Sequence, residues 1–145
     1  MSKAPVAAVI GHPVNHSRSP RMHNYWLAQF GLEGYYIPLD IDPKKFERSI
    51  RNLPELGFVG ANITIPYKEK VLKIADKISD RAALVGAANT LTFLQNGGIY
   101  ADNTDGYGFL QNIKSKYKDW SAREGISVVF GAGGASRAIL GALIE

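Results

Sequence analysis

Val6-Ala7-Ala8-Val9-Ile10-Gly11 is a short apolar run that ends in glycine, and Ser19-Pro20 follows it along the chain. A continuous apolar run of this length, closed by a turn residue, is typical of a buried strand. Serine before proline is typical of a helix start, because the hydroxyl can cap the helix and proline suits its first turn. We therefore expect a strand over residues 6–10 and a helix from Ser19 to about residue 30, where Gly31 ends it.

The alternation of strand and helix continues through the rest of the chain. We expect further strands at residues 35–41, 58–65, 90–94, 99–101 and 127–130, and further helices at residues 43–53, 69–77, 80–85, 107–117 and 134–145. Alternating strands and helices predict an α/β fold in which helices flank a mixed, mainly parallel sheet. Gln95-Asn96-Gly97-Gly98 has the composition of a hairpin turn, so we expect part of this sheet to be antiparallel.

Composition excludes several classes of protein. Apolar residues make up 46% and charged residues 21% of the 145 residues, which is ordinary for one globular domain. The absence of cysteine excludes a disulfide scaffold, a thiolate metal site and a catalytic cysteine. No apolar run reaches the roughly 18–20 residues of a membrane span, and the N-terminal residues lack the apolar stretch of a signal peptide. We therefore expect a cytoplasmic protein with no membrane partner.

Charge and histidine content point to neither nucleic acid nor metal. The net charge of +4 comes from 17 Lys and Arg against 13 Asp and Glu, and these residues are spread along the chain. No recognition motif accompanies the charge, so we expect no nucleic-acid partner, whereas a small acidic substrate fits it equally well. His12 and His16 are near each other, but no carboxylate completes a ligand set and we expect no metal site.

The C-terminal segment predicts a nucleotide-binding turn. Val128-Val129-Phe130-Gly131-Ala132-Gly133-Gly134-Ala135-Ser136-Arg137 has the pattern of a strand, a glycine turn and a helix start. In dinucleotide-binding folds such a turn lets the backbone approach the pyrophosphate, and the helix N-terminus offers free N–H groups. The third glycine of the G-x-G-x-x-G pattern would fall at Ser136, and a glycine turn made only for packing remains the alternative.

Domain boundaries follow from the polar stretch at residues 119–125. We expect a first domain at residues 1–101, a connecting helix and linker at 102–124, and the start of a Rossmann-type dinucleotide-binding domain at 125–145. One βα unit cannot cover both faces of a parallel sheet, so we expect the chain to stop inside this second domain. The residue that selects NAD or NADP would lie about 20 residues beyond the turn, past residue 145.

Polar side chains gather where the predicted strands end. Ser17 and Ser19 follow the first strand, and hydroxyls beside a helix N-terminus suit a carboxylate or phosphate. The alternative is that Ser19 only caps the helix and Ser17 is solvated. Asn62 and Thr64 share one face at the end of the strand at 58–65, because side chains alternate along a strand. Ligands bind at the carboxyl ends of parallel strands, which makes all four residues candidates.

Three further polar residues are candidates with ordinary alternatives. Lys68 lies near a predicted helix start, where the helix dipole disfavours a cation, so it is either functional or a solvated surface lysine. Asp105 follows the strand at 99–101. It either stabilises the first turn of the next helix or pairs with Lys68 across a cleft. Asn89 precedes a strand and either forms a turn or hydrogen-bonds a polyol.

Five motifs, taken in order, resemble those of the shikimate dehydrogenases and cover essentially the whole chain. They are Gly11 with His16-Ser17-Arg18-Ser19-Pro20 and His23-Asn24, then Asn62-Ile63-Thr64-Ile65-Pro66-Tyr67-Lys68, Gly86-Ala87-Ala88-Asn89-Thr90-Leu91, Asn103-Thr104-Asp105-Gly106 and Gly131-Ala132-Gly133-Gly134-Ala135-Ser136-Arg137. The resemblance implies an oxidoreductase that reversibly reduces 3-dehydroshikimate to shikimate with NADPH, in the chorismate branch of aromatic amino-acid biosynthesis. It also implies that the N-terminal domain binds shikimate and that the Rossmann domain binds NADP.

The resemblance also implies roles for individual residues. Lys68 and Asp105 are implied to be catalytic. The residues implied to contact shikimate are Ser17, Ser19, Thr64, Lys68, Asn89 and Asp105, with Asn62 a weaker candidate. Of these, the two serines are implied to bind the carboxylate, and Thr64, Asn89 and Asp105 the ring hydroxyls. The residues implied to contact NADP are Gly131, Ala132, Gly133, Gly134, Ala135 and Asp80.

The resemblance leaves alternatives open. Members of the family continue through a full cofactor domain, so we expect the 145-residue chain to be inactive by itself. A quinate/shikimate dehydrogenase with broader cofactor use is one alternative, and a non-catalytic sensor of a cyclohexane carboxylate is another. The presence of both serines, Lys68 and Asp105 favours an active enzyme over the sensor. A homodimer is compatible with these expectations.

Overall fold

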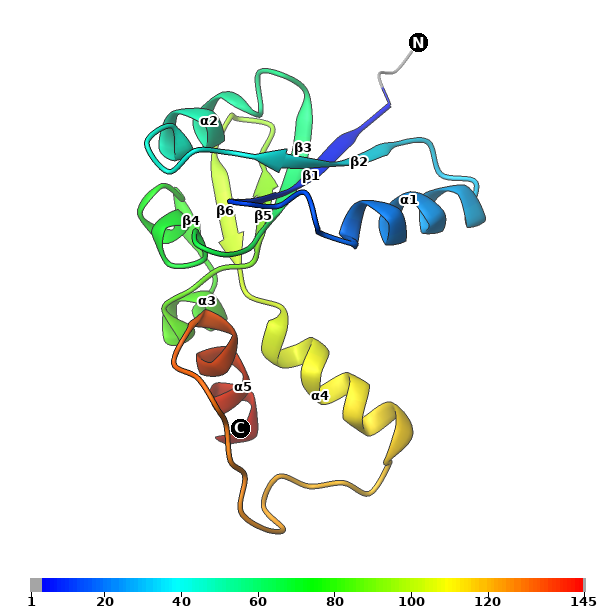
Figure 1. Ribbon diagram of the computed structural model, residues 1–145, viewed down its shortest axis with the longest axis vertical. Coiled ribbons are helices and arrows are strands. Elements are labelled where there is room, and N and C mark those ends of the chain that lie inside the picture. The colour runs from blue at the N-terminus through cyan, green and yellow to red at the C-terminus, as the bar shows by residue number, and fades with distance from the viewer. Residues whose placement is uncertain (1–3, 145) are drawn as a thin grey trace.

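A six-stranded β-sheet forms the centre of the chain in the computed structural model, which describes residues 4–144 (Figure 1). The strands are β1 (Val6–Gly11), β2 (Tyr35–Asp40), β3 (Phe58–Ile63), β4 (Lys77–Ile78), β5 (Thr90–Phe93) and β6 (Ile99–Asp102). Their order across the sheet is β2-β1-β3-β5-β6-β4. The predicted α/β fold with a mixed sheet is confirmed.

The direction of β5 determines which loops meet. β1 pairs in parallel with β2 and β3, β4 pairs in parallel with β6, and β5 runs antiparallel to both of its neighbours. Thr90 at the start of β5 lies between Asn62 of β3 and Asp102 at the end of β6. The carboxyl ends of β1, β3 and β6 and the amino end of β5 therefore share one edge of the sheet.

Helices cover the sheet and extend beyond it. They are α1 (Ser19–Gln29), α2 (Phe46–Asn52), the 3₁₀ helix η1 (Lys70–Lys73), α3 (Asp80–Val85), α4 (Asp105–Lys116) and α5 (Gly134–Ile144). α4 and α5 lie side by side beyond the sheet, and α5 also contacts α3 (Figure 1). Over residues 4–144, no helix combines the length and the apolar character needed to cross a membrane.

The continuous apolar pattern of β1 arises because both of its faces are covered. Ile10 is fully buried in the main core together with Ile50 of α2, while its neighbour Val9 points to the other face and packs with Tyr36. α1 contacts β1 and β2, whereas α2 and η1 contribute to the main core. Each fully buried isoleucine stabilises the fold by about 1.5–3 kcal/mol, so this central strand anchors both layers.

The predicted strand at residues 127–130 is wrong. Residues 126–132 have no regular secondary structure, and Val128 and Phe130 are 70% and 94% exposed. A strand must pair its backbone N–H and C=O groups with a neighbour, and no described strand lies beside this segment. The helix expected after it is present as α5, and its expected last residue, Glu145, lies outside the described residues, as do residues 1–3.

Two other predicted helices are shorter than expected. The predicted helix at residues 69–77 is only the turn η1, because the chain then extends into β4 and pairs with β6. The helix expected to begin at Pro43 begins at Phe46, after a turn in which Lys45 N–H donates to Asp42 C=O at 2.9 Å.

The start of α1 also differs from the prediction. Arg18, not Ser19, occupies the N-cap position, and it makes no side-chain cap. Ser19 is the first helical residue, and its N–H donates to the Ser17 hydroxyl oxygen at 3.3 Å. The Ser19 hydroxyl therefore does not cap the helix as expected, and the Ser17 hydroxyl accepts the first helical N–H instead.

Two glycines of α4 allow a matched test of how α4 packs on α5. A Cβ at Gly106 would lie 2.6 Å from the Ala138 carbonyl oxygen, whereas a Cβ at Gly108 would meet nothing within 4 Å. Gly106→Ala should therefore lower the free energy of unfolding by about 1–3 kcal/mol through overpacking. Gly108→Ala should instead raise it by up to about 1 kcal/mol, because alanine favours a helix. Urea unfolding measures both, and equal effects would contradict the close contact of α4 with α5.

Candidate active site

Loops from four strands meet at the edge where β1, β3 and β6 end and β5 begins. Beyond β3, Thr64 N–H donates to the Ile10 carbonyl of β1 at 2.9 Å. Just before β5, Asn89 N–H donates to the Asp102 carbonyl at the end of β6 at 3.0 Å. These backbone bonds bring the segments with the predicted site residues to one edge of the sheet.

Lys68, Asn89 and Asp105 are in direct contact at this edge. Lys68 Nζ lies 2.5 Å from Asp105 Oδ2, and Asn89 Nδ2 donates to Asp105 Oδ1 at 2.7 Å. The side chains of Lys68 and Asp105 are 18% and 25% exposed, so their attraction is screened less than that of a surface pair. The predicted pairing of Asp105 with Lys68 is confirmed, and both charged groups remain accessible to a small ligand.

The backbone of Lys68 is held on both sides. Tyr67, the preceding residue, is fully buried and stacks on Phe46 with ring centroids 3.9 Å apart. The Lys68 carbonyl accepts the N–H of Ala88 at 2.8 Å. The lysine therefore projects from a fixed loop, which differs from the solvated surface lysine of the alternative interpretation.

Ser17 and Ser19 lie on the loop between β1 and α1, and both are partly exposed. Asp40, at the end of β2, holds the beginning of this loop. Its carboxylate lies 2.6 Å from His12 Nδ1 and accepts the Val14 N–H at 3.1 Å. The hydrogen bonds from His12 and Val14 lower the pKa of Asp40, so the loop is attached to an ionised carboxylate at neutral pH.

Asn62 has structural partners that the sequence did not indicate. Its side-chain oxygen accepts a hydrogen bond from the Tyr36 hydroxyl at 2.6 Å. Burial raises the pKa of Tyr36 to about 12, which keeps that hydroxyl protonated as a donor. His23 stacks on the same tyrosine ring at 4.1 Å between centroids. Asn62 thus links β3 to β2 beneath the edge.

A cavity of about 410 Å³ lies between this edge and the glycine turn. Thr64 and Lys68 line one side, and Gly133, Gly134 and Ala135 line the other. A Cβ at Gly133 would meet nothing within 4 Å, so the backbone there is open to a ligand. Exposed glycine backbone followed by the N-terminus of α5 fits the pyrophosphate of a dinucleotide.

The remaining members of the predicted nucleotide set are placed differently. Gly131 has a φ of +123°, in the region that favours glycine. Gly131 and Ala132 come just before the residues of the turn that line the cavity. Asp80 begins α3, whereas Gly86 at the other end of α3 lies near Arg137 of α5. Asp80 does not line the cavity beside the glycine turn, so its contact with a nucleotide stays a prediction. Arg137 instead forms an ion pair with Glu69, the neighbour of Lys68.

Asp102 and Asn103 support the site and were not singled out from the sequence. Asp102 accepts hydrogen bonds from the Ser79 hydroxyl at 2.6 Å and from Arg81 at 2.5 Å. Burial alone would raise the pKa of Asp102, but these bonds and the Asn103 N–H outweigh it and lower that pKa. Asn103 is only 3% exposed. The only sequence signal for Asn103 was its place in the motif Asn103-Thr104-Asp105.

Within residues 4–144, no three His, Asp or Glu side chains are grouped to hold a metal ion.

Comparisons with known proteins agree with this geometry. The family model described as the shikimate dehydrogenase substrate binding domain matches residues 9–91. A shikimate dehydrogenase (NADP(+)) of Roseobacter denitrificans is 53% identical over 145 residues, which is 100% of this chain and 52% of the relative. The chain therefore spans about half the length of the curated relatives it matches.

Solved structures show the same fold. A shikimate dehydrogenase in complex with NADP+ has a TM-score of 0.91 at 38% identity, covering 97% of this chain and 48% of that one. A shikimate 5-dehydrogenase of Thermus thermophilus in complex with shikimate has a TM-score of 0.89 at 38% identity, covering 97% of this chain and 52% of that one. The family match extends over more than half of the sequence and contains Lys68 and Asn89. This chain belongs to the shikimate dehydrogenase family through its substrate-binding domain.

Proposed function

We propose that this chain supplies the substrate site and the catalytic pair of an NADP-dependent shikimate dehydrogenase, which interconverts 3-dehydroshikimate and shikimate. The observation that carries the proposal is the contact of Lys68, Asn89 and Asp105 at the edge of the sheet. The names of the relatives and the shikimate complex of the Thermus thermophilus structure support it. The domain division at residues 1–101, 102–124 and 125–145 is part of the same proposal.

Shikimate presents a carboxylate at one end of its ring and hydroxyls at the other. Ser17 and Ser19 would donate to the carboxylate from the loop after β1, beside the N-terminus of α1. Thr64, Asn89 and Asp105 would bind the ring hydroxyls from the other three loops. This arrangement supports a substrate that bridges the edge and presents one hydroxyl to Lys68.

The oxidation of a secondary alcohol removes a hydride from carbon and a proton from oxygen. NADP, held by the glycine turn at residues 131–135, would supply the hydride acceptor. Lys68 and Asp105 would take up the hydroxyl proton, and their 2.5 Å contact allows the proton to pass between them. Asn89 holds the other oxygen of the same carboxylate and fixes its orientation.

The glycine turn faces the substrate side across one cavity. Gly133, Gly134 and Ala135 line the same space as Thr64 and Lys68, which supports a nucleotide bound next to the substrate. Asp80 is a weaker candidate for this role, since it lies at the far end of α3.

The cytoplasmic location and the homodimer remain predictions, which cell fractionation and sedimentation of the purified protein would test.

Kinetics of a fusion protein would separate the two predicted roles. Residues 1–145 would be continued by the C-terminal half of the Roseobacter denitrificans relative, and kcat and KM would be measured with shikimate and NADP. Lys68→Ala should lower kcat by about 10²–10⁴-fold, as loss of proton transfer does, with a smaller effect on KM. Ser17→Ala should mainly raise KM, by roughly tenfold, because the carboxylate does not react.

Ser115→Ala, on the exposed C-terminal part of α4, is the matched serine control and should change neither constant. Exchanged effects of the Lys68 and Ser17 variants would contradict the assigned roles. Binding without turnover in the unaltered fusion protein would favour the sensor, and comparable turnover of quinate would favour the broader dehydrogenase.

The 145-residue chain by itself should bind shikimate but should not reduce NADP. Its substrate residues lie on formed loops, whereas residues 126–132 form no strand and only α5 of the cofactor domain is present. Isothermal titration calorimetry with shikimate, and absorbance of NADPH in a parallel assay, measure the two properties. Turnover by this chain would contradict the assignment of NADP binding to a larger Rossmann domain.

A further inference from the structure

Asn103 is a polar side chain placed where polar groups are costly. It lies between β6 and α4 and is 3% exposed, and it is the sole polar residue among the buried residues of the described chain. Both ends of its amide are bonded. Asn103 Oδ1 accepts the Asp105 N–H at 3.0 Å, and Asn103 Nδ2 donates to the Ala87 carbonyl at 2.8 Å.

With a third hydrogen bond, these two connect the backbones of Asp105 and Lys68. Ala87 and Ala88 share a peptide bond, and Ala88 N–H donates to the Lys68 carbonyl at 2.8 Å. The path from Asp105 through Asn103 and this peptide therefore reaches Lys68, and the contact of Lys68 Nζ with Asp105 Oδ2 closes it into a ring. Ala87 and Ala88 are fully buried, which leaves this peptide little freedom to shift.

Only a side chain with both a donor and an acceptor can occupy this position in the ring. Leucine has a similar size but would leave the Ala87 carbonyl and the Asp105 N–H without partners. Ionised aspartate keeps the acceptor for Asp105 but loses the donor to Ala87. The N-cap residue Thr104 makes no side-chain cap, and Asn103 instead accepts the N–H of Asp105, the first residue of α4.

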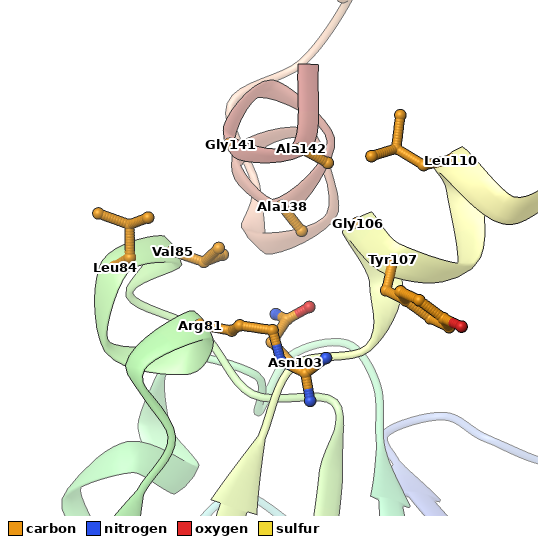
Figure 2. A pocket seen from close by; sticks show the side chains of 10 residues that line it. All are labelled: Arg81, Leu84, Val85, Asn103, Gly106, Tyr107, Leu110, Ala138, Gly141 and Ala142. Carbon is orange, nitrogen blue, oxygen red and sulfur yellow. The ribbon is translucent and has the colours of Figure 1, made fainter. Parts of the chain in front are cut away.

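The space around Asn103 also bears on its role. Figure 2 shows Asn103 with Arg81 at the base of a cavity of about 200 Å³, below Ala138 of α5. Asn103 is one of the residues that line this cavity, although it is only 3% exposed. The bonds to Asp105 and Ala87 hold the amide in one orientation beside this space.

We infer that Asn103 is a positioning residue that sets the distance between Lys68 and Asp105. The inference rests on the proposed function, because it concerns the pair assigned to proton transfer. A substitution that misplaces reacting groups by about 1 Å can cost on the order of 10²-fold in rate, so a buried amide bonded to the backbone of Asp105 can affect turnover strongly.

The first test uses the 145-residue chain and needs no substrate. The ¹H–¹⁵N signal of the Lys68 ammonium group is visible by NMR only while that group is hydrogen-bonded and protected from exchange. We expect this signal in the unaltered chain and its loss in Asn103→Leu and Asn103→Asp. Ile50→Ala removes buried volume from α2 in the main core, so it serves as a control that loses stability and keeps the signal.

The second test uses the fusion protein described above. Asn103→Leu should lower kcat on the order of 10²-fold with a smaller change in KM, whereas Ile50→Ala should leave both within about twofold at a temperature where it is folded. Asn103→Asp has nearly the same shape and replaces the leucine variant if that variant does not fold. A Lys68 signal and a kcat that match the Ile50→Ala control would overturn the inference. Absence of shikimate turnover in the unaltered fusion protein would instead refute the proposed function, and the NMR result would still decide the role of Asn103.

Discussion

The antiparallel direction of β5 between β3 and β6 determines which side chains can meet at the edge of the sheet where β1, β3 and β6 end. Because β5 runs antiparallel, its first residue Thr90 lies at the level of Asn62 and Asp102, and Asn89 extends just past them. A parallel β5 would place Asn89 at the opposite edge, roughly 13 Å away at the usual rise per residue. The contact of Asn89 with Asp105, and the support that it gives to Lys68, follow from this one choice of strand direction.

The pair of Lys68 and Asp105 is better explained by chemistry than by stability. Partial burial removes water from both charges, and that desolvation offsets much of their attraction. Apolar residues of similar size would stabilise the loops at least as well. A charged pair that is accessible to a ligand, with the carboxylate held by Asn89, is an arrangement suited to the proposed proton transfer.

The sequence predicted those parts of the fold that depend on local signals. α3 has the predicted bounds because Ser79 caps its start and Gly86 ends it with a φ of +67°. The hairpin is present because Gly97 adopts a φ of +81°. The strand at 127–130 is absent because pairing depends on a neighbour, and β4 replaces the end of a predicted helix because β6 is there to pair with.

The site was predictable to a similar extent. Lys68, Asn89 and Asp105 were candidates because they follow or precede strands, and the structure brings them together. Asn103 was missed because its burial arises only when β6, α3 and α4 are assembled. Asp80 was assigned from resemblance alone, and no local pattern relates the start of α3 to the glycine turn.

Gly134, at the start of α5, lies in close contact with the segments that precede β5 and follow β3. A Cβ there would lie 2.9 Å from the Ala87 Cβ and 3.5 Å from the Lys68 Cβ. The start of α5 therefore rests directly against the segments that carry Ala87 and Lys68. Any larger residue at position 134 would push the start of α5 away from Ala87 and change the width of the cavity that Gly134 and Lys68 line.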